Sequence, residues 1–204
     1  MVSTWLFRIT VFFFLASFVS MPAMAGEPTD RIREITDKII DIVTNEELKS
    51  QDKIEEKDRL VRKAIDEIFN WEEICRRTLA RNWSKRTEEE KKEFIILFGK
   101  LMENTYLDRI GNYSGEQVSY VGEKIDGNYA LVKVKIQTAQ ETEIPVIYRL
   151  KKKDGSWLTY DVSIEGISLI NNYRSQFNSI ILKSSYENLI KKLRVKITEK
   201  QAPE

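Results

Sequence analysis

The sequence predicts an α+β fold, in which several helices cover one face of a curved antiparallel sheet of four or slightly more strands. Two observations lead to this prediction. From Asp30 to Ile110, apolar residues recur at spacings of three and four, the period of amphipathic helices. From Gln117 to Ile164 the period is two, as in half-buried strands. Because an antiparallel sheet with one wet face buries its other face, we expect the helices to cover that face.

The first 25 residues have the features of a secretory signal peptide. A short leader with Arg8 precedes an apolar run from Ile9 to Val19, and Ala23 and Ala25 form an A-x-A cleavage pattern. The apolar run is shorter than the roughly 20 residues of a membrane-spanning helix, which favours a cleaved signal over an uncleaved anchor. We therefore expect residues 1–25 to be removed and residues 26–204 to form a single exported domain.

Four helical segments are expected before the sheet. The side chain of Thr29 or Asp30 would cap the first segment. Thr87 and Glu90 have the spacing of a capping box, in which each side chain binds a free backbone amide at the start of the fourth segment. The expected segments are Asp30–Val43, Glu46–Phe69, Asn70–Asn82 and Thr87–Ile110.

The expected strands follow one another through short connections. Asp126-Gly127 and Asp154-Gly155 are typical of tight hairpin turns, so neighbouring strands should pair as an antiparallel meander. In the last strand the apolar residues alternate and are expected to share the buried face of the sheet. These residues are Leu158, Tyr160, Val162 and Ile164.

Gly166 lies where the pattern changes from strand to helix. A glycine there permits a sharp change of direction. A last helix is expected from about Ser184, with Glu187 three residues on as the second half of another capping box. The helix directly after Gly166 is expected to bury Ile167, Ile170, Tyr173, Phe177 and Ile181.

The composition excludes several kinds of site. The chain has no histidine, which removes Ser-His-Asp and Cys-His catalysis and histidine metal sites. Its one cysteine, Cys75, can form neither an internal disulfide nor a cysteine-cluster zinc site, and we expect it to be a small buried hydrophobe. No glycine-rich phosphate-binding pattern is present. We therefore expect no metal and no cofactor.

The charge of the chain gives no support to nucleic-acid binding. Removing residues 1–25 takes Arg8 from the 33 basic residues and none of the 32 acidic residues, which leaves 32 of each. A nucleic-acid partner would require a basic excess or patch. What remains is apolar surface, which either packs as an ordinary core or leaves an apolar cavity between a concave sheet and the helices over it.

Several short stretches follow one another in an order that is typical of one protein family. They are Phe69-Asn70-Trp71, Arg76-Arg77-Thr78-Leu79, Trp83, Phe94 with Phe98 and Leu101, Thr105-Tyr106, Pro145-Val146-Ile147-Tyr148, Gly155-Ser156-Trp157 and the run from Tyr160 to Phe177. With these stretches the chain resembles the MlaC family of periplasmic phospholipid-binding proteins, also called toluene-tolerance proteins. Ala80 departs from the family, which usually has glycine there, and the helix after Ile181 lacks a glycine common in the family.

The resemblance implies a periplasmic shuttle for glycerophospholipids. Its partners would be an outer-membrane Mla lipoprotein complex and an inner-membrane Mla ABC transporter complex, and its function would be intermembrane lipid transport that maintains outer-membrane asymmetry. The acyl chains would lie in the cavity with the headgroup exposed, and no catalytic step is required. We expect nine residues to line the lipid cavity: Phe98, Leu101, Tyr106, Val134, Tyr148, Val162, Ile164, Tyr173 and Phe177.

Two other readings of the whole chain stay open. An enzyme for a small molecule would need carboxylates or tyrosines that converge in the cavity, and a structural adaptor would have a cavity filled by side chains. Arg174 also has two readings, because it could bind a lipid phosphate or pair with Asp161 or Glu165, and the pairing is favoured. The candidates for acid–base chemistry are Asp161, Glu165, Tyr120, Tyr148 and Tyr160, with a structural role favoured for both carboxylates.

Overall fold

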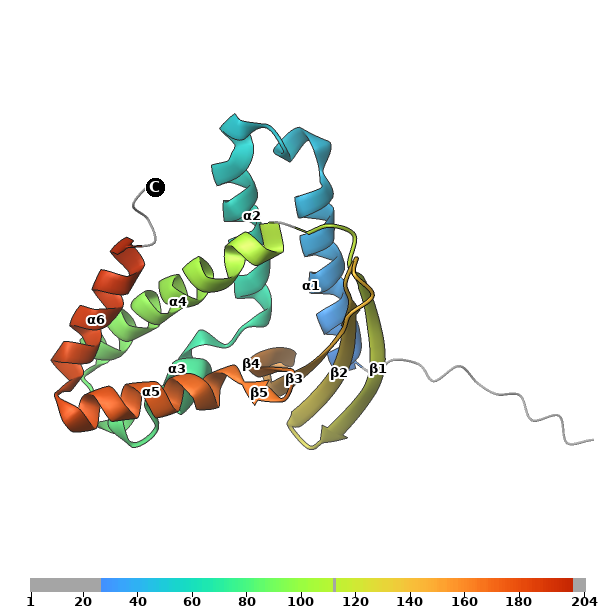
Figure 1. The fold of residues 1–204 in the computed structure, drawn as a ribbon. Coiled ribbons are helices and arrows are strands. Elements are labelled where there is room, and N and C mark those ends of the chain that lie inside the picture. Colours follow the sequence, from blue (N-terminus) through green and yellow to red (C-terminus); the bar gives the residue numbers. More distant parts are fainter. Residues whose placement is uncertain (1–26, 112, 200–204) are drawn as a thin grey trace, which may run out of the picture.

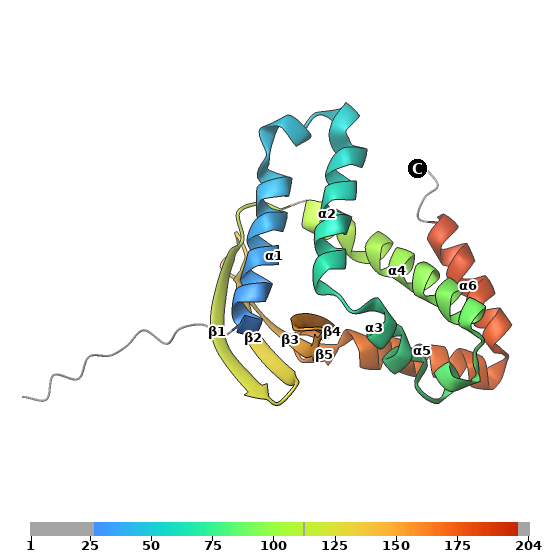
Figure 2. The ribbon, with the colours of Figure 1, turned by 180° about the vertical axis from the view of Figure 1, so that it is seen from behind.

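The computed structural model describes residues 27–111 and 113–199, which form an α+β fold (Figure 1). The predicted signal peptide lies outside the described residues. The sheet and the first two helices make one side of the molecule, and the later helices make the other, as Figures 1 and 2 show from opposite directions. No helix within residues 27–111 and 113–199 is long and apolar enough to cross a membrane.

The sheet is an antiparallel meander of five strands over the described residues. Its order is β1-β2-β3-β4-β5, so each strand pairs with its neighbour in sequence. The turn at Asp126-Gly127 joins β1 to β2, and Gly127 takes a positive φ of 54° that suits glycine. Asp154 and Gly155 join β3 to β4. The strands are β1 (Gln117–Asp126), β2 (Tyr129–Gln137), β3 (Glu143–Lys153), β4 (Ser156–Ile164) and β5 (Ile167–Ser168).

Two helices form a hairpin over the inner face of the sheet. These are α1 (Glu27–Thr44) and α2 (Ile54–Ile68), joined by 3-10 turns at Glu46–Leu48 and Gln51–Lys53. The buried residues with which these two helices and the sheet pack together are here called the sheet core. The sheet core consists of Ile32, Ile35, Ile68, Ala130, Val132, Val134, Val146, Leu150, Trp157 and Val162.

The prediction that Thr29 or Asp30 caps the first helix is wrong, because α1 begins at Glu27. Thr29 lies inside the first turn and is 4% exposed. Its backbone amide and hydroxyl both donate to the Glu123 carboxylate on β1, at 2.8 and 2.6 Å. These bonds attach the start of α1 to the sheet. The expected single segment from Glu46 to Phe69 is instead two 3-10 turns followed by α2.

The remaining helices pack on one another to form a second core. The helices are α3 (Trp71–Leu79), α4 (Glu88–Gly111), α5 (Leu169–Lys183) and α6 (Tyr186–Glu199), with a 3-10 turn at Ala80–Lys85. Their buried residues are here called the helical core. The helical core consists of Ile74, Cys75, Leu79, Phe94, Phe98, Leu101, Ile170, Tyr173, Phe177, Tyr186, Leu189, Ile190, Leu193 and Ile197.

The helix starts follow local side-chain chemistry. The predicted capping box of α4 is confirmed, because the Glu90 amide donates to the Thr87 hydroxyl and the Thr87 amide donates to the Glu90 carboxylate, at 3.2 and 2.8 Å. Helix α6 is capped one residue later than predicted, since the amide of Asn188 donates to the hydroxyl of Ser185. The expected burial of Cys75 is confirmed, and burial raises the pKa of its thiol.

The side chains of β4 do not alternate regularly between the two faces of the sheet along the whole strand. This differs from the prediction. The β3–β4 register shifts because Arg149 pairs with Asp161 and Leu150 pairs with Thr159, which leaves Tyr160 as an extra residue in β4. An inserted residue moves all side chains beyond it to the opposite face. Trp157 is therefore in the sheet core, as is Val162, whereas Leu158 and Tyr160 lie on the other face. The prediction that these two share the buried face is wrong.

The turn at Gly166 leads into a short strand before the helix begins. Ile167 and Ser168 form β5, which pairs with Ser163 and Ile164 of β4. Ile167 is 63% exposed, so it does not belong to the buried stripe of the following helix as predicted. The hydroxyl of Ser168 accepts from the Asn171 amide and caps α5. The change from strand to helix takes place at Ser168.

Candidate functional site

An apolar cavity of about 600 Å³ separates the sheet core from the helical core. Residues of α1 and α2 form one wall, residues of α4 form the opposite wall, and β2–β4 form the floor. The residues around it are Ile32, Ile35, Thr36, Ile39, Arg62, Ile65, Asp66, Ile68, Phe69, Trp71, Ile74, Ile95, Ile96, Gly99, Lys100, Met102, Glu103, Tyr106, Leu107, Ile110, Ile136, Tyr148, Asp161, Val162, Ile164, Leu169 and Ile170. A volume of this size is typical of small-molecule sites.

Isoleucine is the most frequent residue around the cavity. A β-branched side chain has few accessible χ1 rotamers, so it does not swing inward to fill the space. Gly99, in the middle of α4, adds to the opening because a Cβ placed on it would meet no atom within 4 Å. The wall therefore combines stiff aliphatic side chains with one position that has no side chain.

The floor of the cavity comes from paired positions on neighbouring strands. Tyr148 on β3 is opposite Val162 on β4, and Ile164 is opposite Val146. Burial raises the pKa of Tyr148 to about 12. The hydroxyl therefore stays protonated across the physiological range, and Tyr148 contributes a largely apolar surface.

Asp161 is buried beside the cavity, where hydrogen bonds occupy both of its oxygens. Its Oδ2 accepts from Arg149 Nη1 at 3.3 Å and from Ser168 Oγ at 2.8 Å, and its Oδ1 accepts from the backbone amide of Ile170 at 3.2 Å. Arg149 also donates to Ser163 Oγ at 2.7 Å. The carboxylate thus joins β3 and β4 to the start of α5. Because donors already bind both of its oxygens, its geometry suits a structural role rather than that of a general base.

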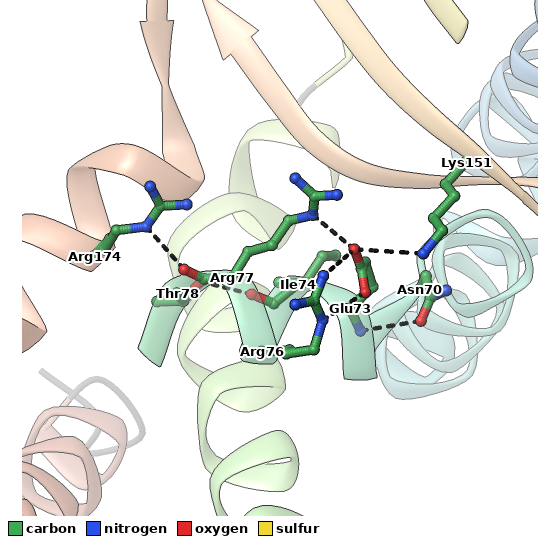
Figure 3. Close-up of polar contacts among 8 residues, drawn as sticks. All are labelled: Asn70, Glu73, Ile74, Arg76, Arg77, Thr78, Lys151 and Arg174. Carbon is green, nitrogen blue, oxygen red and sulfur yellow. Dashed lines mark hydrogen bonds and ion pairs between the residues drawn. The ribbon is translucent and has the colours of Figure 1, made fainter. Parts of the chain in front are cut away.

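A second buried carboxylate, Glu73, joins α3 to the sheet (Figure 3). It accepts two hydrogen bonds from Arg76 and one from Arg77, at 2.6 to 2.8 Å, and lies 3.9 Å from Lys151 Nζ on β3. The Arg76 hydrogen bonds lower the pKa of Glu73 to about 2, with Arg77 contributing further. The backbone amide of Asn70, just before α3, adds a bond to the carbonyl of Thr159 on β4 at 2.9 Å.

Arg174 connects α5 to α3 and does not pair with a carboxylate at the strand–helix corner. Its Nε donates to the backbone carbonyl of Arg77 at 2.8 Å (Figure 3). Asp161 pairs with Arg149 instead. The prediction that Arg174 pairs with Asp161 or Glu165 is therefore wrong, because the helix turns Arg174 toward α3. This hydrogen bond links two helices of the helical core, and binding of a lipid phosphate by Arg174 stays a prediction.

The opposite side of the cavity has charged side chains where α2 faces α4. Arg62 and Asp66 come from α2, and Lys100 and Glu103 come from α4. Arg62 forms an ion pair with Glu103, which links the two helices. Asp66 accepts a hydrogen bond of 2.7 Å from the indole of Trp71. Within the described residues, no group of histidine, cysteine and acidic side chains could hold a metal ion.

Comparison with known proteins assigns this chain to a family. The model of the MlaC protein family matches residues 33–195. The chain belongs to the MlaC family. The intermembrane phospholipid transport system binding protein MlaC of Haemophilus influenzae is 25% identical over 194 residues, which cover 92% of this chain and 90% of that protein.

A solved structure of similar fold is that of the phospholipid-binding protein from Ralstonia solanacearum, determined in complex with a phospholipid. It superposes with a TM-score of 0.77 at 20% identity and covers 87% of this chain and 100% of its own. At this level of identity the similarity supports the fold. The α+β architecture predicted for this MlaC-family chain is confirmed.

The structure brings only some of the predicted lipid-contacting residues to the cavity. Tyr106, Tyr148, Val162 and Ile164 lie around it. Val134 is 2% exposed and lies in the sheet core. The other four predicted residues, Phe98, Leu101, Tyr173 and Phe177, are packed in the helical core. Contact with lipid stays a prediction for all nine.

Most residues around the cavity were not among those predicted. The largest omissions are the α1 and α2 wall, with Ile35, Ile39 and Ile65, and the α4 wall, with Ile95 and Ile96. The sequence contains a signal for the α1 and α2 wall, because Ile35, Ile39 and Ile65 lie on amphipathic helical stripes. That signal indicates that a face is apolar, but it does not say whether the face meets another side chain or an empty space. Ile95 and Ile96 have no such signal, because apolar residues surround α4 on most sides.

Proposed function

We propose that this protein is a periplasmic phospholipid-binding shuttle of the intermembrane Mla transport system. Its mature part, residues 26–204, would be a single phospholipid-binding domain released by cleavage of residues 1–25. It would exchange glycerophospholipid with an outer-membrane Mla lipoprotein complex and an inner-membrane Mla ABC transporter complex. The names of the family relatives support this proposal, and the observation that carries it is the apolar cavity between the sheet core and the helical core.

The size of the cavity suits acyl chains. Taking a methylene to occupy about the volume of one water molecule, ~30 Å³, a space of about 600 Å³ accommodates roughly 20 methylenes. Burial of ten methylenes is worth roughly 8 kcal/mol before the costs of association. Lipid held in this way would leave slowly into water, so transfer requires a docked acceptor that competes for the chains.

The polar groups near the cavity favour carriage over catalysis. Asp161 accepts three hydrogen bonds that hold strands and helix together. Tyr148 has its pKa raised to about 12, the opposite of what a general base at neutral pH needs. Glu165 lies at an exposed turn. A shuttle requires none of these groups to react.

Lipid analysis of the purified protein tests the proposal. The mature protein is isolated from the periplasm of lipid-replete cells without detergent, denatured and extracted, and the extract is quantified by mass spectrometry against the protein concentration. We expect phospholipid in a near-stoichiometric amount. Protein isolated in this way without bound phospholipid would contradict the proposal.

A cavity-filling variant locates the lipid. Gly99→Phe places an aromatic ring in the empty space at Gly99, so lipid per protein should fall at least several-fold. Lys92→Phe is the matched control, because it puts the same side chain on an exposed position of the same helix that does not border the cavity. Equal lipid contents in the two variants would mean that the lipid is bound elsewhere.

A further inference from the structure

Apart from Asp161, the charged residues that the structure describes around the cavity are four side chains from two helices. Arg62 and Asp66 come from α2, and Lys100 and Glu103 come from α4. We call these four residues the charged rim. Asp161, which also borders the cavity, is buried among the strands and engaged by Arg149. The charged rim has two positive and two negative groups, and its formal net charge is zero.

The spacing on each helix presents these groups to the same region. Arg62 and Asp66 are four residues apart, and Lys100 and Glu103 are three apart, so each pair lies on one face of its helix about one turn apart. The ion pair between Arg62 and Glu103 spans the gap between the helices. Their side chains are 42% and 27% exposed, so the charged rim lies at the solvent-facing end of the cavity.

We propose that the charged rim binds the headgroup of a zwitterionic phospholipid, a phosphodiester with an ammonium group, in preference to an anionic headgroup. This inference rests on the proposed function and names the class of lipid for the same cavity. A lipid whose acyl chains occupy the apolar space places its headgroup at the open end. In this structure that end is the charged rim.

The available donors and acceptors match both parts of such a headgroup. Arg62 uses Nε toward Glu103, and a guanidinium has four further N–H donors that can bind phosphate oxygens. Lys100 adds a second positive charge. Glu103 pairs through Oε1, which leaves its second oxygen for the ammonium group, and Asp66 is held in position by Trp71. A zwitterion satisfies both signs, whereas an anionic headgroup brings no cation of its own for the second oxygen of Glu103 or for Asp66.

A purely structural role for the Arg62–Glu103 pair makes a different prediction. If the pair only holds α2 against α4, removing either partner breaks the same link and changes lipid binding in the same way. If the charged rim reads the headgroup, removing the cation and removing the anion change the lipid preference in opposite directions. The signs of the two changes therefore distinguish the roles.

The test uses lipid-free mature protein incubated with vesicles that contain equal amounts of phosphatidylethanolamine and phosphatidylglycerol. The protein is separated from the vesicles, and its bound lipids are quantified by mass spectrometry. The variants are Arg62→Gln and Glu103→Gln. Lys63→Gln and Glu89→Gln are matched controls, since these exposed residues of α2 and α4 do not border the cavity. Circular dichroism and thermal unfolding verify that each variant is folded.

We expect wild type and controls to bind more of the zwitterionic lipid. Glu103→Gln should shift the bound ratio toward the anionic lipid by roughly fivefold, the size expected for one partly exposed charge pair. Arg62→Gln should shift the ratio further toward the zwitterionic lipid. Unchanged ratios, or equal shifts in both variants, overturn the inference and leave the proposed function intact if total lipid per protein stays near one. Wild-type protein that takes up no phospholipid overturns both.

Discussion

The helical core and the cavity are both apolar, yet one is filled and the other is empty. In the helical core, aromatic rings contact one another directly, with centroids of Phe98 and Tyr173 at 5.0 Å and of Phe98 and Phe177 at 5.4 Å. Around the cavity isoleucine predominates, and Gly99 leaves further space. Large flat rings interlock and close the gaps between helices. The branched side chains of the opposing walls have few χ1 rotamers, which limits how far they can rotate into the space between them.

The two sides of the cavity also differ in how they are joined. On one side, Asp161 accepts hydrogen bonds from Ser168 and the Ile170 amide at the start of α5. There α3 is linked to the sheet by the Glu73–Lys151 ion pair and by the backbone bond from Asn70 to Thr159. On the other side, a single ion pair between Arg62 and Glu103 is the polar link between α2 and α4 that the described residues show. This asymmetry places the firm connection away from the charged rim, so any widening of the cavity should occur between α2 and α4.

The largest expected effect is on stability, in a comparison of Phe98→Ala with Ile164→Ala. Phe98 is fully buried against three other rings, so its removal should lower the free energy of unfolding by about 3–5 kcal/mol. Ile164 already borders empty space, so its truncation should cost less than about 2 kcal/mol. Urea unfolding of the lipid-free proteins measures both. Equal losses would indicate that the cavity is closed in solution.

Glu73 should make the junction between the two regions sensitive to acid. The pKa of this carboxyl is lowered to about 2 in the folded protein, below its ordinary value. A lowered pKa stabilises the fold above the unfolded pKa, and this contribution is lost as the pH falls toward 2. Allowing for solvent screening, Glu73 should contribute about 1–2 kcal/mol at pH 6.

The comparison with Glu73→Gln isolates that contribution. The difference in unfolding free energy between wild type and variant, from urea titrations at several pH values, should be largest at pH 6 and shrink steadily between about pH 5 and pH 2. The other carboxylates titrate alike in both proteins and cancel in the difference. A difference that does not change with pH would mean that the Arg76 and Arg77 contacts do not hold the charge in solution.

The sequence was sufficient to predict the fold but not the position of the cavity walls. Apolar periods of 3.6 and 2 follow from how side chains leave a helix or a strand, so the helices, the meander and the capping box at Thr87 could be predicted. The change of face along β4 could not be predicted, because no sequence pattern marks Tyr160 as an extra residue. That single residue decides that Trp157, not Leu158, faces the sheet core.

The predicted lining was biased toward aromatic residues for a related reason. Phe98, Tyr173 and Phe177 lie on strongly apolar stripes, and periodicity reports only that such a face is buried. Whether the opposing surface touches it depends on helix positions set by tertiary packing. Likewise, the turn of α5 that carries Arg174 faces α3, and only the three-dimensional arrangement shows that the nearest acceptor is a carbonyl of Arg77.

Ala80 provides a smaller test on the filled side. It ends α3 with φ 49° and ψ −122°, a conformation that glycine adopts far more easily than alanine. Such strain is worth of order 1–3 kcal/mol, and part of the gain from relieving it is lost to the greater freedom of glycine in the unfolded chain. Ala80→Gly should therefore raise the unfolding free energy by about 1 kcal/mol in urea titrations, without changing lipid content. A loss of stability would show that residue 80 has an ordinary helical conformation.

Gly99 provides the corresponding test on the empty side, with the smallest expected effect. A glycine inside a helix costs about 0.5–1 kcal/mol relative to alanine, and the Cβ of Gly99→Ala would meet no atom within 4 Å. The variant should therefore gain stability by up to that amount in urea titrations. Gly111→Ala is the control, because Gly111 also has open space but is the last residue of α4, where glycine is tolerated better. A methyl group added to a closed core strains its neighbours, so a destabilised Gly99→Ala would show that this wall of the cavity is packed.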